Sequence, residues 1–231
     1  MRIGAVVLTR LDSTRLPGKA LADVNGHPLL WYCLERLKGS RSLDSVVIAT
    51  TDRPVDKPIS AYARSEGFQI YRGAAMDVAG RFLQAGITHK FDAIVRINAD
   101  CPLLDIDLLD CACEVMRKDE FDIITNVFPR TFPFGIIVEI LKTEVLSQGY
   151  SRMVSASEFE HVTKHFYDTS NSYNIKNIAI QNHSAERMLN YRFTVDTLGQ
   201  LQAFQRFVAT RNQPWVATTF EEGLAFGGFG V

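Results

Sequence analysis

Short, fully apolar runs alternate along this chain with segments in which apolar residues recur every three to four positions. Residues 3–9 form a β-branched and aliphatic run, which is typical of a strand buried on both faces of a parallel sheet. Similar runs occupy residues 45–50, 68–71, 93–98 and 121–125, and helical patterns occupy residues 28–39, 58–67, 77–89 and 105–118. This alternation predicts right-handed crossovers, so we expect the first half to be a doubly wound α/β sheet that binds its ligand at the strand C-termini.

The pattern loosens after residue 126. The segment FPRTFPFGIIVEIL mixes prolines, aromatics and a strand-like end, which indicates a small extension, spanning about residues 127–165, from the main sheet. Within and beyond it we expect helices at residues 142–149 and 155–167, a strand at 192–195 and a helix at 198–210. The Gly-rich residues 224–231 are expected to be a loose tail. The whole chain of 231 residues is expected to form one domain.

Charge and composition narrow the classes of partner. Lys and Arg number 25 against 26 Asp and Glu, so no overall field would draw the protein onto nucleic acid or an anionic membrane. No apolar run reaches the roughly 20 residues that cross a bilayer, and the N-terminus lacks a signal-peptide pattern. Four cysteines show no zinc-ligand spacing and are expected to be reduced thiols. We therefore expect a cytoplasmic protein.

A cationic loop follows the first predicted strand, in the sequence TRLDSTRLPGK. Arg10, Arg15 and Lys19 are spaced through it, and Ser13 and Gly18 leave backbone amides free to face an anion. Guanidinium groups form paired hydrogen bonds with phosphate oxygens, and a lysine supplies a compact positive charge. This composition therefore suits the binding of a polyphosphate. The alternative is a solvated basic loop, but the position at a strand C-terminus favours ligand binding. The order GxxxxGK[ST] of a Walker loop is absent.

The sequence LTRLDSTRLPGK resembles the nucleotide-binding loop of the cytidylyltransferases that activate 3-deoxy-manno-octulosonate and acylneuraminate, in particular their spore-coat polysaccharide branch. The similarity continues through ATTDRPVDKPI, YRGAAMDVAGRF, VRINADCPLLD, PRTFPFGIIVEI, EHVT and TVDT, and so covers most of residues 1–197. It implies a Rossmann-like nucleotide-diphospho-sugar transferase fold with a mostly parallel sheet flanked by helices. It also implies CTP as donor, a sugar-like acid as acceptor, Mg²⁺ as cofactor, and a role in cell-surface polysaccharide synthesis.

The resemblance also implies roles for individual residues. The residues that would contact the triphosphate and carry the catalysis are Arg10, Arg15 and Lys19. Others would lie near the nucleotide, namely Leu8, Ser13, Thr51, Asp52, Gly73, Asp77 and Asp100. Magnesium would be held by Asp100 and Asp196. The acceptor would face Arg81, Asn98, Glu139 and His161.

Elementary chemistry supports some of these assignments and leaves others open. Asp100 and Asp196 each follow a predicted strand, so both carboxylates can reach the same sheet edge, although each could instead cap a helix or turn. His161 and His165 have helical spacing without the order HExxH, so we do not expect a zinc site. A structural role remains the alternative for His161, as it does for Arg81 and Asn98. Structural ion pairs are expected for Arg96 and Arg192.

One segment departs from the family pattern. Where the family suggests PxGxDxE, this chain has Phe134 and Ile137 and keeps only Glu139. One hypothesis is an acceptor less polar than a hydroxyl-rich sugar; the alternative is that the two apolar side chains pack in a strand or a subunit contact. By analogy with related enzymes we expect a homodimer through this region. Three rival functions remain: transfer from another nucleoside triphosphate, a non-catalytic nucleotide-binding subunit, and a glycosyltransferase.

Overall fold

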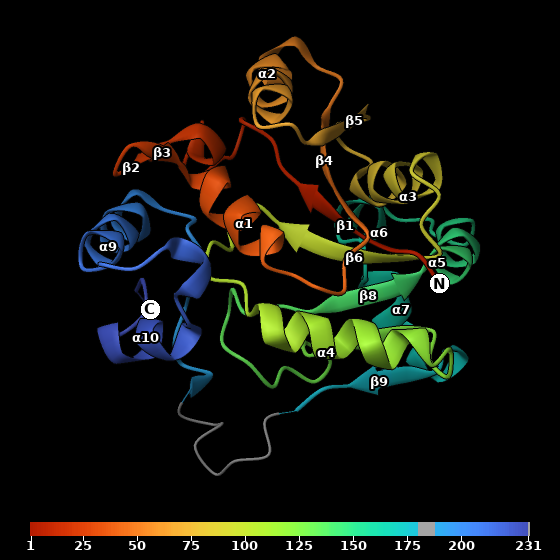
Figure 1. The fold of residues 1–231 in the computed structure, drawn as a ribbon. Helices are drawn as coiled ribbons and strands as arrows, with labels where there is room; N and C mark the ends of the chain where they lie inside the picture. The colour runs from red at the N-terminus through yellow and green to blue at the C-terminus, as the bar shows by residue number, and fades with distance from the viewer. Residues whose placement is uncertain (180–187, 231) are drawn as a thin grey trace.

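The computed structural model describes residues 1–179 and 188–230. Its strands are β1 (Ile3–Leu8), β2 (Asp23–Val24), β3 (His27–Pro28), β4 (Ser45–Thr51), β5 (Gln69–Gly73), β6 (Ala93–Asn98), β7 (Ile123–Thr125), β8 (Glu139–Lys142) and β9 (Ile175–Asn177). Its α-helices are α1 (Leu29–Lys38), α2 (Lys57–Ser65), α3 (Val78–Thr88), α4 (Ile106–Arg117), α5 (Thr143–Tyr150), α6 (Ala156–Glu160), α7 (Lys164–Asp168), α9 (Leu198–Ala209) and α10 (Phe220–Phe226). Figure 1 shows the helices arranged around a central sheet.

The central sheet has the strand order β5-β4-β1-β6-β8-β7-β9. Strands β5, β4, β1 and β6 run parallel, and β8 is antiparallel to both β6 and β7. The chain moves from β1 outward to β4 and β5 and then returns to place β6 on the other side of β1. Strand order therefore reverses between β1 and β6, which is where an open α/β sheet leaves a crevice for its ligand.

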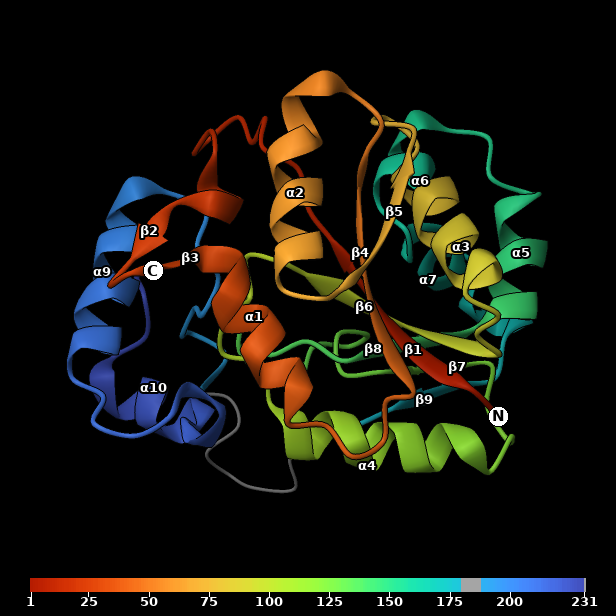
Figure 2. The ribbon, with the colours of Figure 1, turned by 45° about the horizontal axis from the view of Figure 1, so that its top comes forward.

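Alternate residues of β1 pack on opposite faces of the sheet. Ile3, Ala5 and Val7 lie in a buried cluster with residues of α1, α2 and α4. Val6 and Leu8 face a second cluster that includes residues of α3, α5 and α7. Figure 2 shows these two sets of helices on either side of the sheet. The uninterrupted apolar runs of the sequence are explained by this burial on both faces, as predicted.

Three expected elements differ in the structure. The helix expected at residues 155–167 is two short helices, α6 and α7, separated by residues 161–163, because His161 leaves the helical conformation with a φ of −104° and a ψ of 86°. The segment expected as a strand at residues 192–195 forms no strand with the residues that the structure describes, although Arg192 makes an isolated bridge with Phe134. The extension expected at residues 127–165 is not wholly outside the main sheet, since β8 is inserted between β6 and β7.

The C-terminal region is more ordered than the expected loose tail. Residues Phe220–Phe226 form α10, which begins with a capping box between Thr219 and Glu222. Phe229 is 1% exposed and packs against Phe193, Phe204 and Phe207 in a third buried cluster. Glycine content suggested a tail, but the buried Phe229 and the contact of Phe226 with Phe207 anchor the segment. No helix among residues 1–179 and 188–230 has the length and apolarity needed to traverse a bilayer.

Candidate active site

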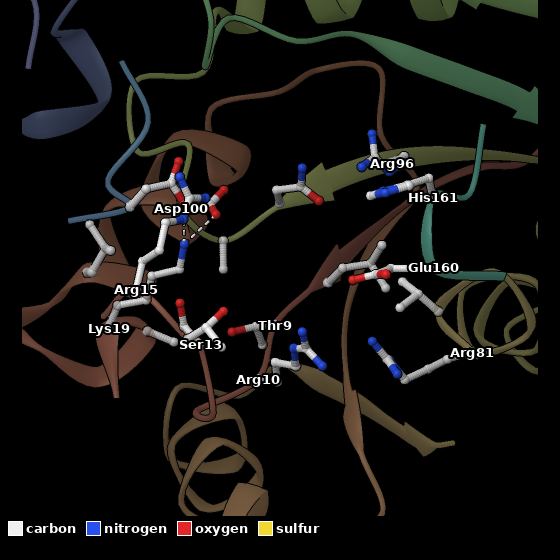
Figure 3. Close-up of a pocket in the computed structure, with 18 residues that line it drawn as sticks. Thr9, Arg10, Ser13, Arg15, Lys19, Arg81, Arg96, Asp100, Glu160 and His161 are labelled. Carbon is white, nitrogen blue, oxygen red and sulfur yellow. Dashed lines mark hydrogen bonds and ion pairs between the residues drawn. The ribbon is translucent and has the colours of Figure 1, made fainter. Parts of the chain in front are cut away.

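A cavity of about 360 Å³ opens at the carboxyl ends of β1 and β6, at the point where strand order reverses (Figure 3). Its walls come from the loop after β1, the end of β6, the first turns of α3 and the end of α6. The lining residues are Leu8, Thr9, Arg10, Ser13, Thr14, Arg15, Lys19, Ala20, Leu29, Val78, Arg81, Arg96, Asn98, Ala99, Asp100, Glu160, His161 and Asp196.

The cationic loop between β1 and Lys19 is held by its own backbone and by the turn after β4. Gly18 has a φ of 75°, a conformation that side chains disfavour, and its N–H donates to the carbonyl of Leu11 at 2.6 Å. The N–H of Leu11 in turn donates to Oδ1 of Asp56 at 2.7 Å, and Asp56 is fully buried. These contacts fold the loop back on itself and set Lys19 at the start of a short 3-10 helix that faces the cavity.

Lys19 joins two carboxylates that are far apart in the sequence. Its Nζ donates to Oδ2 of Asp100 at 2.6 Å and to Oδ1 of Asp196 at 2.9 Å. Arg15 also lies 2.9 Å from Oδ1 of Asp196. Arg15, Lys19, Asp100 and Asp196 therefore meet in one cavity, and their roles toward a nucleotide and a metal stay predictions.

The ionisation of this cluster follows from burial and charge together. Burial opposes the charged form of Lys19, but the carboxylates of Asp100 and Asp196 outweigh it and raise the pKa of the amine. Burial likewise opposes the charged form of Asp196, yet the hydrogen bond and charge of Lys19, with Arg15, lower the pKa of this carboxyl. Lys19 and Asp196 are therefore both ionised at neutral pH.

Backbone contacts bring Asp196 beside Asp100. The N–H of Val195 donates to the carbonyl of Asp100 at 2.9 Å, and the N–H of Phe193 donates to the carbonyl of Phe134 at 2.6 Å. Gly135 permits this approach, because a Cβ there would lie 2.6 Å from the carbonyl carbon of Phe193 and its φ is 100°. The glycine of the PFG sequence thus positions an aspartate about sixty residues later in the chain.

Ten of the residues named from the sequence line the cavity: Leu8, Arg10, Ser13, Arg15, Lys19, Arg81, Asn98, Asp100, His161 and Asp196. Five do not: Thr51, Asp52, Gly73, Asp77 and Glu139. The first four of these lie at or just after the ends of β4 and β5, or at the start of α3. Asp77 caps α3 by accepting from Gly80 N–H at 2.7 Å and accepts again from the Tyr150 hydroxyl at 2.7 Å, so its structural role is clear.

Glu139 does not line the cavity but contacts Arg96, which does. It is 1% exposed, and its two oxygens accept from Arg96 Nη1 and from the Tyr167 hydroxyl, the latter at 2.6 Å. The ion pair expected for Arg96 is therefore present. The one expected for Arg192 is not found among the described residues, where its guanidinium instead lies 4.5 Å from the ring centre of Phe134.

Phe134 and Ile137 both lie outside the cavity lining. The Phe134 ring is flanked by Arg192 and by Arg130, whose guanidinium carbon is 4.1 Å from the ring centre. Ile137 packs against the buried cluster that includes Val138 and Ile140. These contacts fit the packing alternative, and neither residue lines the cavity in which the altered-acceptor hypothesis would place it.

Four polar lining residues were missed or differently assigned from the sequence: Thr9, Thr14, Arg96 and Glu160. Arg96 and Asn98 are two positions apart on β6, so the alternation of a strand indicates that they share a face. Glu160 precedes His161 at the end of α6, where the helix stops and both residues reach the cavity. The shared face of Arg96 and Asn98 could have been predicted from the sequence. The position of Glu160 at the cavity depended on where α6 ends.

Comparisons with known proteins agree with this geometry. The chain matches the cytidylyltransferase family over residues 5–214. The spore coat polysaccharide biosynthesis protein SpsF of Bacillus subtilis is 30% identical over 198 residues, which cover 83% of this chain and 80% of that protein. A 3-deoxy-manno-octulosonate cytidylyltransferase of Pelobacter propionicus is 31% identical over 119 residues, or 52% of this chain and 46% of that enzyme.

A solved structure of a cytidylyltransferase has a similar fold. A cytidylyltransferase from Leptospira borgpetersenii superposes with a TM-score of 0.90 at 27% identity, covering 98% of this chain and 94% of that one. The fold expected from the sequence is thereby confirmed. Since the family match takes in residues 5–214 of the 231, this chain belongs to the cytidylyltransferase family and is a CTP-dependent nucleotidyltransferase.

Proposed function

We propose that the protein transfers CMP from CTP to a sugar-like acid of the 3-deoxy-ulosonic or nonulosonic type, with Mg²⁺ as cofactor, for cell-surface polysaccharide synthesis. The observation that carries the proposal is the contact of Lys19 Nζ with both Asp100, at 2.6 Å, and Asp196, at 2.9 Å. A cation and two acids from distant segments meet there, at the end of the cationic loop. Cationic side chains that can neutralise a phosphoryl group, beside carboxylates that can hold a metal ion, suit phosphoryl transfer.

The reaction is a displacement at the α-phosphorus of CTP. An oxygen of the acceptor forms a bond to the α-phosphorus, the bond from that phosphorus to the bridging oxygen breaks, and pyrophosphate leaves with the electron pair. The acceptor hydroxyl releases its proton to solvent, which balances the step. The protein must align two anions and neutralise the charge that grows on the leaving group, and we assign this neutralisation to Arg10, Arg15 and Lys19.

The donor set at Asp100 and Asp196 fits a divalent cation. Magnesium prefers oxygen ligands and is commonly held by one or two carboxylates, with phosphates and water completing the shell. Residues 1–179 and 188–230 offer no cluster of three or more His, Cys, Asp or Glu side chains suited to a metal, so nucleotide phosphates would have to supply further ligands. When bound there, the cation would polarise the phosphoryl oxygens and offset their charge.

The relatives support the choice of donor and acceptor class. Both the matched family and the solved Leptospira protein are described as cytidylyltransferases, and one partial relative is described as acting on 3-deoxy-manno-octulosonate. The similarity to a spore coat polysaccharide biosynthesis protein supports a role in surface polysaccharide synthesis. The proposal includes action in the cytoplasm and a homodimer that covers Phe128 and Phe134, which are 38% and 40% exposed.

The test is a mass-spectrometric screen of acceptor acids with Mg²⁺ and each of CTP, GTP, UTP and ATP. We expect a CMP adduct and pyrophosphate with CTP and at least one acid, and no adduct with the other three nucleotides. Equal turnover of GTP or UTP would favour a different donor. Binding of CTP without pyrophosphate release under any condition would favour a non-catalytic subunit. Light scattering coupled to size-exclusion chromatography checks the dimer separately.

A further inference from the structure

We propose that Arg96 binds the carboxylate of the acceptor acid, with His161 beside it. Glu139 and Tyr167 hold the Arg96 side chain in position. This inference rests on the proposed function and adds to it the part of the cavity that recognises the acid. In this inference Glu139 does not contact the acceptor directly, as the resemblance implied, but positions Arg96.

The guanidinium of Arg96 is bonded on one side and open on the other. Arg96 lines the cavity on the same face of β6 as Asn98, and its side chain is 20% exposed. Its Nη1 donates to Glu139, its Nε is buried without a hydrogen-bond partner, and no contact of Nη2 is found among the described residues. A guanidinium held in this way keeps donors for a second carboxylate.

Glu139 and Tyr167 fix the direction in which Arg96 points. Glu139 is almost fully buried, and the Tyr167 hydroxyl occupies its second oxygen at 2.6 Å. Tyr167 is in turn 2.8 Å from Thr125 Oγ1 and stacks on Phe128 with ring centres 4.6 Å apart. Burial opposes the charge of Arg96, but the neighbouring Glu139 carboxylate outweighs it and raises the pKa of the guanidinium, so Arg96 stays ionised.

The other cations of the cavity are already engaged elsewhere. Lys19 and Arg15 contact Asp100 and Asp196, at the end of the cavity that we assign to the triphosphate. Arg10 lies 3.5 Å from Asp12 on the cationic loop. Arg81 donates from Nη1 to the carbonyls of Ala74 and Ala75, which ties it to the loop before α3.

Arg96 and His161 lie apart from this triphosphate end in the view of Figure 3, and both line the cavity. In a 3-deoxy-ulosonic or nonulosonic acid the carboxylate is bonded to the carbon that carries the reacting hydroxyl, so a carboxylate held by Arg96 would direct that hydroxyl toward the phosphates. The guanidinium would also offset the repulsion between this carboxylate and the triphosphate. The arrangement therefore suits an acid and disfavours a neutral sugar, whose uncharged group would gain less from the guanidinium.

The test compares an acid with its neutral carboxamide. The probe is whichever of 3-deoxy-manno-octulosonate and N-acetylneuraminate forms a CMP adduct with the wild-type protein, together with its carboxamide. We expect Arg96→Met to raise KM for the acid by about ten- to a hundredfold, the range of a charge-assisted hydrogen bond, with KM for CTP unchanged. The carboxamide should bind poorly to the wild type and be little affected by the substitution.

Two further variants separate positioning from folding. Arg96→Lys keeps the charge without the planar fork and should recover part of the affinity for the acid. Tyr167→Phe removes only the hydroxyl that holds Glu139 and should raise KM for the acid less than Arg96→Met does. Arg41→Met, at an exposed arginine outside the cavity, is the matched control and should change neither KM. Circular dichroism and thermal melts establish that each variant is folded.

The outcomes distinguish this inference from the function on which it rests. An unchanged KM for the acid in folded Arg96→Met, or equal turnover of acid and carboxamide by the wild type, overturns the role of Arg96 and leaves the proposed function standing. If Arg96→Met does not fold, an unchanged KM for the acid in both Arg96→Lys and Tyr167→Phe has the same meaning. Absence of a CMP adduct from any acid with the wild type overturns the proposed function and this inference with it.

Discussion

Replacing Lys19 by Met tests the centre of the site most directly. Methionine nearly preserves the length and apolar stem of the side chain but removes the charge that Asp100 and Asp196 share. The Lys19 side chain is 13% exposed and that of Asp196 is 11% exposed, so water replaces the lost partner poorly. We therefore expect both stability and turnover to fall.

The size of the stability loss can be worked from these contacts. At an effective dielectric constant of about 20, one ion pair at about 4 Å is worth about 4 kcal/mol before desolvation, and Lys19 makes two closer ones, at 2.6 and 2.9 Å. Removing one member of a buried pair typically costs about 3–5 kcal/mol. Because Arg15 stays beside Asp196, we expect Lys19→Met to lower the free energy of unfolding by about 2–4 kcal/mol.

The loss should depend on pH in a defined direction. The raised pKa of Lys19 contributes stability that is complete below 10.5 and is lost as pH rises through the folded-state pKa. The lowered pKa of Asp196 contributes stability that is present above 3.8 and is lost as pH falls through its folded-state value. The difference between wild type and Lys19→Met should thus be largest between pH 3.8 and 10.5.

Urea denaturation followed by circular dichroism measures this difference, and Lys38→Met is the matched control. Lys38 also lies 2.9 Å from a carboxylate, that of Glu35, but its side chain is 47% exposed, so its removal should cost less than about 1 kcal/mol. Turnover with CTP should fall by about 100- to 1,000-fold in Lys19→Met, with a much smaller change in CTP affinity. Equal stability losses in the two variants, or full activity in Lys19→Met, would refute the assignment.

Three further substitutions test the site and the fold. Asp100→Asn should abolish activity together with its dependence on Mg²⁺, and initial rates across a Mg²⁺ titration check this; a normal titration curve would rule out Asp100 as a metal ligand. Phe229→Ala should lower the free energy of unfolding by about 3–5 kcal/mol, because the ring is buried among other aromatic side chains; a loss below about 1 kcal/mol in urea denaturation would mean that the C-terminal segment is loose. The hydrogen bond from His165 and those from the backbone of residues 154 and 155 lower the pKa of Glu158 to about 2 from 4.5, so the stability that they supply is present above pH 4.5 and is lost as pH falls toward 2. Glu158→Gln should therefore reduce the acid sensitivity of thermal melts in that window, and an unchanged pH profile would contradict the contribution of this carboxylate.

The regular part of the fold was predictable because its signals are local. Burial on both faces of β1, β4 and β6 requires continuous apolar runs, and the caps of α3 and α4, Asp77 and Asp105, are polar residues directly before helical patterns. The cationic loop was identified for the same reason, since it follows a buried strand directly. Five residues that the sequence analysis named in or next to this loop line the cavity, namely Leu8, Arg10, Ser13, Arg15 and Lys19.

Contacts between distant segments were less accessible to sequence reasoning. In the sequence, Glu139 cannot be told from an acid that binds a ligand. Only its burial against Arg96 and Tyr167 shows that it holds other side chains in place. The break between α6 and α7 falls at His161, whose backbone is not helical, and a helical pattern over residues 155–167 does not reveal it. Likewise, glycines near the C-terminus suggested a loose tail until the pocket that receives Phe229 was known.

The sequence by itself determined the class of fold and the position of the phosphate loop, because periodicity, glycine placement and charge are properties of neighbouring residues, while the resemblance to the cytidylyltransferases implied the residues of a nucleotidyltransferase site. The positions of Asp100 and Asp196 after predicted strands indicated that both carboxylates could reach one sheet edge, and the tertiary structure decided the contacts that join them. Asp196 joins Lys19 and Asp100 through the backbone contact of Val195 with Asp100 and the close approach that Gly135 allows. These contacts form between segments that lie far apart along the chain and meet only when it folds, so no local pattern encodes their geometry.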